Sequence, residues 1–491
     1  MSQHLRLHGL LWLLPLAGLR AQTTSLYTQV AAGESHSLAL RADGTLWAWG
    51  ANNYSQLGNG NTTGRSLPAP VAAPVAAAPG TRWTSIASRS SHALAGRSDG
   101  TLWAWGYNDY GNLGDGTLTT RVSPVLVPVP AGAAVGTTWG QVATNYHTLA
   151  LRSDGTLWAW GLNNVGQLGD ASTAARLAAV AVPTPAAAAA GTTWTKVDVG
   201  RDHSLALRSD GTLWAWGGNA YGQLANGTPA GLATPRAVVT PAGAAAGTTW
   251  TDFAAGYYFS LGLRSDGTLW AWGYNPYGQL GDASTTSSLV PVAVVTPGTV
   301  GAGTRWTRVA AGNDHALALR SDGSLWAWGY NNYDQLGIQL SNGGTPPSSS
   351  TPVRETTNGT WSAVAGGYYT TLALQAATTL VYGTGYNRSG QLGTGNITNS
   401  PVFVASAAPL LATRPARVPL VGVHPNPARA QCRLPALPPG STVRLTDLRG
   451  SLVRQQAAAP TLSLTGLAPG LYLLTAQAPG QAPRVARLAV E

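Results

Sequence analysis

The stretch GRDHSLALRSDGTLWAWGGNAYGQLANG, from Gly200 to Gly227, decides the fold. It holds two apolar segments, HSLALR from His203 and LWAWG from Leu213, separated by the polar residues SDGT. Apolar and polar side chains alternate in the first segment, as they do in a half-buried strand. The Asp-Gly pair favours a tight hairpin, because Gly tolerates positive φ freely and Asp tolerates it better than most residues. The stretch therefore predicts two antiparallel strands followed by a polar turn.

The same pattern recurs along most of the chain. LWAWG begins at Leu46, Leu102, Leu157, Leu213, Leu269 and Leu325, and the degenerate VYGTG begins at Val381. The spacing between these positions is 55 or 56 residues throughout. A second phrase, of the form W-T-x-V-A-A-G, opens the repeats near residues 27, 83, 139, 194, 250, 306 and 361. Each of the seven W-T-x-V-A-A-G phrases is followed by one LWAWG or VYGTG phrase, so the chain contains seven repeats in one register.

Each repeat contains four predicted strands. After LWAWG comes a polar turn such as YNPYGQLG (Tyr274 to Gly281), then a Pro- and Val-rich strand, then a link of small residues. A single four-stranded sheet cannot bury both faces, whereas sheets stacked radially around an axis can. We therefore predict an all-β chain with a seven-bladed β-propeller of four-stranded blades over residues 22–404. A solenoid is the alternative, and the lack of obvious capping repeats favours the closed ring.

These residues resemble the regulator-of-chromosome-condensation repeat family, whose repeat reads G-x-x-H-x-x-A-L, then a D-G turn, then W-G-x-N-x-x-G-Q-L-G. The stretch from Gly200 to Gly227 carries nearly every element, and the resemblance spans about residues 26–404. It implies a seven-bladed propeller of long blades. Members of the family serve in unrelated ways, including guanine-nucleotide exchange on a small GTPase, light sensing and inhibition of β-lactamase, so the fold leaves the function open.

The N-terminus has the features of a signal peptide. Arg6 precedes the apolar run LLWLLPLAGL, and Leu19-Arg20-Ala21 forms a cleavage site, so residues 1–21 are predicted to be removed on export. The run is too short for a spanning helix, and we expect no transmembrane segment. Cys432 is the one cysteine, which excludes disulfides within the chain.

The C-terminal part of the chain lacks the repeat. Residues 405–417 are predicted to be a linker, and residues 418–491 contain short strands and Pro-Gly turns typical of a small β-sandwich. This module resembles the C-terminal sorting domain (type A) of the type IX secretion system. The resemblance implies that the protein reaches the periplasm, that the secretion machinery recognises residues 418–491, and that the destination is the cell surface or the medium. An immunoglobulin-like accessory domain is the alternative.

The net charge of +10 belongs to the C-terminal part. Residues 414–491 hold nine Arg against Asp447 and Glu491, whereas residues 21–413 hold 18 Lys and Arg against 17 Asp and Glu. Binding to nucleic acid needs a basic surface, so we expect no nucleic-acid partner for the nearly neutral propeller.

Two residue types that recur in the repeats, His and Trp, are common in functional sites. His36, His92, His147, His203 and His315 occupy one repeat position, but a wide ring cannot bring imidazoles from separate blades to one metal ion. We interpret each as a structural residue that bonds turn backbone within its own blade. The two Trp of each LWAWG share one face of their strand, where they could stack on sugars or pack blade against blade, and their recurrence favours packing.

Positions that differ between repeats are better candidates for a partner site. In a meander, alternate turns emerge at the same end, so the turn before the His and the N-x-x-G-Q-L-G turn share one face. Tyr, Arg and Asp gather there, and Tyr provides a large contact area at little entropic cost. The predicted partner-binding residues are Tyr54, Tyr110, Tyr146, Arg201, Asp202, Tyr221, Tyr257, Tyr258, Tyr277, Asp314, Tyr333, Tyr368 and Tyr369. In the alternative interpretation, these tyrosines only pack turn against turn.

The sequence predicts a binding protein rather than an enzyme. It contains no phosphate-cradling loop, G-x-S-x-G, H-E-x-x-H or calcium loop, so we expect neither cofactor nor metal. Our first hypothesis is a secreted or cell-surface monomer that binds a protein or a glycan. The second is an extracellular polysaccharide lyase or hydrolase that uses Glu34, Asp202 or Asp314. Guanine-nucleotide exchange follows only from the family resemblance, and export argues against it.

Overall fold

The computed structural model describes residues 27–74, 76–298, 303–339, 344–407, 418–419, 428–447, 452–478 and 484–491. The chain divides into two compact units, Met1–Ala408 and Pro409–Glu491. The predicted signal peptide and residues 408–417 of the predicted linker lie outside the described residues. Among the described residues, no helix has the length and apolar character needed to cross a membrane.

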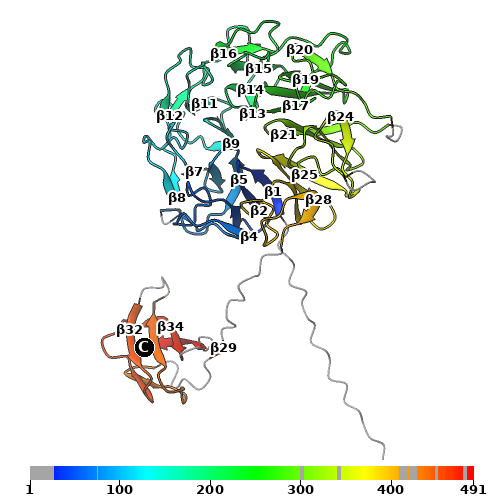
Figure 1. Cartoon of the computed structure of the whole chain (residues 1–491). Coiled ribbons are helices and arrows are strands. Elements are labelled where there is room, and N and C mark those ends of the chain that lie inside the picture. The colour runs from blue at the N-terminus through cyan, green and yellow to red at the C-terminus, as the bar shows by residue number, and fades with distance from the viewer. Residues whose placement is uncertain are drawn as a thin grey trace, which may run out of the picture. The chain divides into compact units, whose positions relative to one another are not determined.

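The first unit is a ring of seven four-stranded antiparallel sheets, the blades, around a central axis (Figure 1). The innermost strands are β1 (Tyr27–Ala32), β5 (Trp83–Ser88), β9 (Trp139–Thr144), β13 (Trp194–Val199), β17 (Trp250–Ala255), β21 (Trp306–Ala311) and β25 (Trp361–Gly366). The second strands are β2 (His36–Arg41), β6 (His92–Arg97), β10 (His147–Arg152), β14 (His203–Arg208), β18 (Phe259–Arg264), β22 (His315–Arg320) and β26 (Thr370–Gln375).

Two further strands complete each blade. The third strands, which carry LWAWG, are β3 (Leu46–Gly50), β7 (Leu102–Gly106), β11 (Leu157–Gly161), β15 (Leu213–Gly217), β19 (Leu269–Gly273), β23 (Leu325–Tyr330) and β27 (Val381–Gly385). The outer strands are β4 (Arg65–Pro70), β8 (Arg121–Leu126), β12 (Arg176–Ala181), β16 (Leu232–Ala237), β20 (Ser288–Ala293), β24 (Ser348–Arg354) and β28 (Ser400–Ala405). The predicted all-β propeller is confirmed.

The ring closes by packing, without exchange of a strand between the first and last blades. Blade 7 consists of the consecutive strands β25 to β28, and blade 1 of β1 to β4. Tyr27 and Trp49 of blade 1 pack with Leu372 and Val381 of blade 7. The indole nitrogen of Trp49 donates to the carbonyl oxygen of Gln391 at 2.8 Å. This boundary therefore repeats the contacts found between other blades.

The hydrophobic core is divided into layers between neighbouring blades. The second Trp of LWAWG is fully buried in each of the six blades that have it: Trp49, Trp105, Trp160, Trp216, Trp272 and Trp328. Between blades 4 and 5, Trp272 packs with Leu205, Leu213 and Leu224 of the preceding blade. The tryptophans thus pack blade against blade, as the sequence predicts, and do not form a surface for stacking sugars.

A polar connection, which we name the indole bridge, recurs in these layers. Trp272 Nε1 donates to the backbone oxygen of Gln223 in the preceding blade at 2.9 Å, and Ser260 Oγ donates to the same oxygen at 3.0 Å. The indole bond recurs at 2.8 to 3.0 Å from Trp49, Trp105, Trp160, Trp216 and Trp328. Thr384 replaces the Trp in blade 7, and its hydroxyl lies 2.9 Å from the backbone oxygen of Asp334 in the preceding blade and 2.8 Å from that of Ser400 in its own blade.

The recurring histidines join neighbouring blades. His203 Nε2 lies 3.0 Å from Ser260 Oγ of the next blade, and since that hydroxyl donates to Gln223, the imidazole is the donor. His36, His92, His147 and His315 bond hydroxyls of the next blade at 2.5 to 3.0 Å. The predicted bond to turn backbone within each blade is wrong. The imidazole of His203 lies over Gly200, where a Cβ atom on residue 200 would come within 2.1 Å of it. In this position Nε2 of His203 extends to the neighbouring blade.

The second compact unit holds two sheets. The five-stranded sheet, in the order β29-β35-β34-β31-β32, and the two-stranded sheet β30-β33 together contain β29 (Val418–Pro419), β30 (Gln431–Arg433), β31 (Thr442–Thr446), β32 (Leu452–Ala457), β33 (Thr461–Ser463), β34 (Gly470–Gln477) and β35 (Arg484–Val490). Cys432 and Leu462 of the small sheet pack with Val443, Leu474 and Leu488 of the large one. This unit therefore has a core of its own.

Substitution of Trp272 tests the indole bridge. We predict that Trp272→Phe lowers the free energy of unfolding by about 1 kcal/mol, because the ring contacts remain and one hydrogen bond is lost. Trp272→Ala should cost about 3–5 kcal/mol, because it leaves a cavity between two blades. Denaturant titration followed by fluorescence measures both losses. The control Tyr277→Phe, at an exposed ring, should change the value by less than about 0.5 kcal/mol; equal losses in all three variants would contradict this account.

Acid should weaken the propeller through its buried histidines. Burial lowers the pKa to about 3 in His36, His92, His147, His203 and His315. In the folded chain these histidines stay neutral, whereas in the unfolded chain each one binds a proton below pH of about 6.5. The free energy of unfolding therefore falls from about pH 6.5 toward pH 3, by ~2 kcal/mol per histidine at pH 5. We predict that His203→Phe, which copies Phe259 of blade 5, reduces the difference in unfolding free energy between pH 7 and pH 5 by that amount. An unchanged pH dependence would refute it.

Candidate functional site

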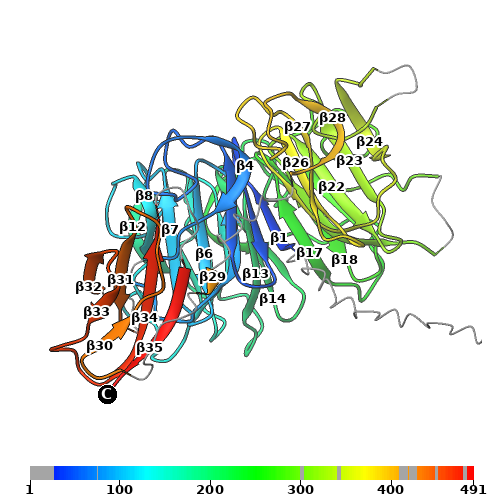
Figure 2. The same ribbon diagram turned by 90° about the horizontal axis from the view of Figure 1, so that it is seen from below.

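The tyrosines of the propeller gather at one end of the ring. The blades stand side by side with their strands running between two ends (Figure 2). At one end lie the turns that join first to second strands and third to outer strands, and we name this end the tyrosine face. It carries every tyrosine of the propeller except Tyr27 and Tyr382: Tyr54, Tyr107, Tyr110, Tyr146, Tyr221, Tyr257, Tyr258, Tyr274, Tyr277, Tyr330, Tyr333, Tyr368, Tyr369 and Tyr386.

The structure brings the predicted tyrosines into contact with one another. Consecutive ring contacts with centroids 4.6 to 5.8 Å apart connect Tyr221, Tyr258, Tyr257, Tyr368, Tyr369 and Tyr333 across blades 4 to 7. A second series, 5.1 to 6.0 Å apart, runs through Tyr54, Tyr107, Tyr110 and Tyr146 in blades 1 to 3. Most of these pairs are edge to face, the geometry that aromatic rings prefer. The predicted residues therefore form a packed surface.

Tyr146, Tyr257 and Tyr368, from blades 3, 5 and 7, meet near the axis. The Tyr368 hydroxyl donates to the Tyr257 hydroxyl at 3.3 Å. Burial raises the pKa of Tyr257 to about 12 and also raises the pKa values of Tyr146 and Tyr368. Arg201 lies over the Tyr257 ring, 5.2 Å from its centroid, and donates to the Tyr258 hydroxyl. The centre of the tyrosine face therefore offers neutral hydroxyl groups beside the Arg201 cation.

Two partly buried carboxyl groups lie among these rings. Asp202 is 3.7 Å from Arg201 Nε, and burial raises the pKa of Asp202 despite that neighbour. Asp314 accepts a hydrogen bond from Gln279 Nε2 at 3.5 Å, and burial raises its pKa to about 6. Glu34 accepts a hydrogen bond from Ser91, so each carboxyl has a separate partner. Within the described residues, no three His, Cys, Asp or Glu side chains are grouped to hold a metal ion.

Sequence reasoning missed four tyrosines of this face. Tyr107, Tyr274 and Tyr386 directly follow the third strand of their blades, and Tyr330 is the last residue of β23. Each packs against predicted residues. Tyr274, for example, lies 4.7 Å from Tyr221 of the preceding blade, centroid to centroid. The signal in the sequence is the aromatic residue immediately after the W-G of the repeat, or after the T-G of blade 7, within the turn that the pattern predicts to be polar.

The axial channel is crossed by Arg89 close to this face. Its guanidinium donates to the backbone oxygens of Val199 in blade 4, at 2.9 Å, and Ala311 in blade 6, at 2.6 Å. A cavity of about 310 Å³, lined by Arg89 and by the innermost strands of all seven blades, follows the axis. Lys196 contacts the Asp252 carboxylate there, and burial lowers the pKa of Lys196 to about 8. The charged groups of the channel are thus largely occupied with the protein itself.

Several known proteins are similar to this chain. It is 30% identical to the ultraviolet-B receptor UVR8 of Arabidopsis thaliana over 311 residues, 63% of this chain and 66% of the receptor. It is 31% identical to the human E3 ubiquitin-protein ligase HERC2 over 292 residues, 59% of this chain and 6% of the ligase. The chain thus spans slightly less than two thirds of the first relative and a small part of the second.

A solved structure and a family model complete the comparison. Yeast RCC1 (Prp20), solved with Kap60 bound to it, aligns with a TM-score of 0.63 at 22% identity, covering 80% of this chain and 87% of that chain. This likeness shows the fold alone. The family model described as the RCC1-like domain matches residues 14–294 and, in a second match, residues 141–424. These matches cover most of the seven repeats, and the chain belongs to the RCC1-like domain family.

Proposed function

We propose that this protein is an exported binding module, whose tyrosine face takes a partner and whose C-terminal unit directs its delivery. One observation carries the first part: the two aromatic residue types are segregated. The tryptophans of LWAWG are buried between blades, whereas all the tyrosines of the ring except Tyr27 and Tyr382 lie on one face. Packing accounts for the tryptophans, but it does not require large side chains to remain accessible at one end.

The tyrosine face has the physical properties of a binding surface. Tyr54, Tyr221 and Tyr277 are 50, 39 and 38% exposed, so wide ring surfaces face the solvent. Contiguous exposed aromatic area is uncommon on soluble proteins unless something binds to it. The edge-to-face contacts restrict the rotation of these side chains before any partner arrives, which lowers the entropic cost of association. Arg201 and Asp202 supply charges for orientation.

A protein partner suits this face better than a glycan. Sugars stack on the flat faces of aromatic rings, whereas the edge-to-face contacts of the tyrosine face bury one ring face against the edge of the next. Tyr together with Arg is also the mixture that protein interfaces favour. Glycan binding is the second candidate, supported by the exposed rings of Tyr221 and Tyr277.

The alternative of polysaccharide cleavage rests on one observation. Burial raises the pKa of Asp314 to about 6, which is the range of a general acid. Cleavage also needs a second carboxyl group and a cleft for the chain. Asp314 does not line the axial cavity, and its recorded hydrogen-bond partner is Gln279. We therefore place this activity below binding.

Delivery is proposed from the two ends of the sequence. Residues 1–21 have the pattern of a signal peptide, and residues 418–491 resemble a type IX sorting domain. The described part of residues 409–491 forms a compact unit with a core of its own. Such a unit can be recognised, and even removed, without unfolding the propeller. Its removal would take most of the positive charge with it.

Binding is tested with a triple variant of the exposed rings, Tyr54→Ser, Tyr221→Ser and Tyr277→Ser. Purified full chain is applied to an array of surface-exposed proteins from the producing cells and, in parallel, to a glycan array. We expect the native chain to retain a small set of proteins and the variant to lose at least tenfold in affinity, because the contact area is gone. The midpoint of thermal unfolding should change little.

The matched control carries Asp154→Asn, Asp210→Asn and Asp266→Asn, in hairpins at the opposite end of the ring. It should bind as the native chain does. Binding to glycans alone would support the second candidate. If the tyrosine variant bound normally, or unfolded as readily as a Trp272→Ala variant, the proposed face would be rejected.

Sorting is tested by deletion of residues 418–491 in a host that has type IX secretion. We expect the shortened chain to accumulate in the periplasm, because the signal peptide still acts and the sorting module is missing. Immunoblots of periplasm, cell surface and medium measure the distribution. Fusion of residues 418–491 to an unrelated periplasmic protein should carry that protein across the outer membrane. Unchanged export of the shortened chain would refute the sorting role.

A further inference from the structure

The outer strand β12 of blade 3 presents an open edge. An outer strand pairs with its own blade on one side, so alternate residues direct their N–H and C=O groups away from it. At one end of β12 the Leu177 oxygen already accepts a hydrogen bond from Gly116 N of blade 2 at 3.0 Å, so the free part of the edge lies at Ala179 and Ala181. Val182 N donates to Leu157 O at 2.9 Å, and Val180 pairs with Ala159. By this alternation, Val180 and Val182 bond to β11, whereas Ala181 points away from the blade. Ala179 lies where the register between β11 and β12 shifts, and the prolines at this position in other blades show that the sheet does not need its N–H.

Proline occupies the position of Ala179 in five other blades. The same pairing register places Pro68, Pro124, Pro235, Pro291 and Pro352 there. Proline has no N–H, and its presence prevents another strand from adding to the edge. Blade 7 has Phe403 at this position but carries Pro401 in the same strand. Among the seven outer strands of the propeller, all of them described, β12 (RLAAVA) is the one without a proline.

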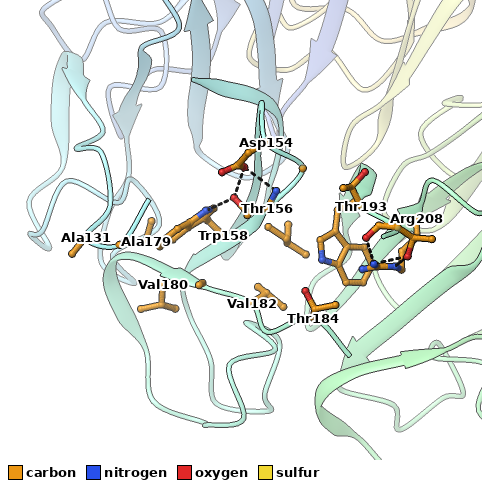
Figure 3. Close-up of a pocket in the computed structure, with 16 residues that line it drawn as sticks. Ala131, Asp154, Thr156, Trp158, Ala179, Val180, Val182, Thr184, Thr193 and Arg208 are labelled. Carbon is orange, nitrogen blue, oxygen red and sulfur yellow. Dashed lines mark hydrogen bonds between the residues drawn. The ribbon is translucent and has the colours of Figure 1, made fainter. Parts of the chain in front are cut away.

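A cavity of about 620 Å³ borders this same edge (Figure 3). Figure 3 shows Ala179, Val180 and Trp158 on one side of it and Arg208 on the other, with Val182 between them. Its volume lies within the range of about 300–1,000 Å³ found for ligand sites. The open edge and the cavity are independent features that meet at one strand.

Several polar side chains around the cavity are already paired. The Thr156 hydroxyl donates to Asp154 at 2.6 Å and accepts from Trp158 Nε1 at 3.0 Å. Arg208 Nε donates to the Thr192 hydroxyl at 2.8 Å. What remains for a ligand is a mainly apolar wall, with the hydroxyls of Thr184 and Thr193, beside free backbone groups. This combination suits an extended peptide, whose main chain bonds the edge while alternate side chains enter the cavity.

We propose that β12 and the adjoining cavity form a docking site for a short extended segment of another protein, which adds to blade 3 as a fifth strand and places apolar side chains in the cavity. The length of the edge selects this occupant. Six residues of β12 span only ~20 Å. A stable interface between two folded proteins buries about 1,200–2,000 Å², so pairing with a second copy through this edge is disfavoured. The site is separate from the tyrosine face.

The experiment uses the full chain and a fluorescent peptide of alternating Val and Thr with a Lys at each end. We expect anisotropy to show saturable binding and hydrogen exchange to slow in β12. Ala179→Pro should weaken binding at least tenfold, because it removes the outward N–H. Five blades already carry proline in this register, so the variant should keep the native thermal midpoint.

Blade 4 provides the matched variant. Pro235 lies beside a cavity of about 510 Å³, and Pro235→Ala restores the outward N–H there. We expect this variant to take up a second peptide and to slow exchange in β16 as well. Unchanged affinity in Ala179→Pro, or no slowing of exchange in β12 at saturating peptide, would overturn the proposal. Self-association of the native chain that Ala179→Pro abolishes would also overturn it, in favour of a second copy.

Discussion

The hydrogen bond from a buried indole to a backbone carbonyl of the preceding blade is the interaction on which the ring depends. A buried indole N–H without a partner costs about 1–3 kcal/mol, so each blade is held at the position that satisfies it. The bond uses a main-chain oxygen, which explains why Asn112 can stand where other blades have Gln. Six of the seven blades make this bond, and its length of 2.8 Å between blades 7 and 1 is close to the 2.9 to 3.0 Å found between other blades.

Gln223, whose backbone is part of the indole bridge, also connects the ring to the tyrosine face. The backbone oxygen of Gln223 receives the indole of Trp272, while its side-chain oxygen accepts the N–H of Tyr221 at 3.0 Å. Equivalent side-chain bonds hold the N–H groups of Tyr54, Tyr277 and Tyr333. One conserved geometry within the chain therefore fixes both the contact between blades and the turn that presents a tyrosine. Because the glutamine binds the backbone N–H, the side chain at the tyrosine position can vary without disturbing the contacts between blades.

Much of the fold could be predicted from the sequence, because repeats constrain each other. The strands, the Asp-Gly hairpins and the burial of the tryptophans follow from patterns within a single repeat. The direction of the His203 ring could not, since it depends on Gly200 beneath it and on a hydroxyl in another blade. The role of Arg89 is likewise invisible, because its partners lie 110 and 222 residues away. The free edge at Ala179 required the pairing register of β12.

The central claim is that the recurring residues hold the ring and the tyrosine face is available for binding. A saturation mutagenesis scan of residues 27–405, scored by the yield of protease-resistant folded chain, tests it most directly. The account predicts a severe loss of folded chain at Trp272, Gln223 and their equivalents for those substitutions that break the indole bridge or the turn that supports it. It predicts that most substitutions at Tyr54, Tyr221 and Tyr277 leave the yield unchanged. Equal intolerance at these tyrosines and at the buried tryptophans would contradict it.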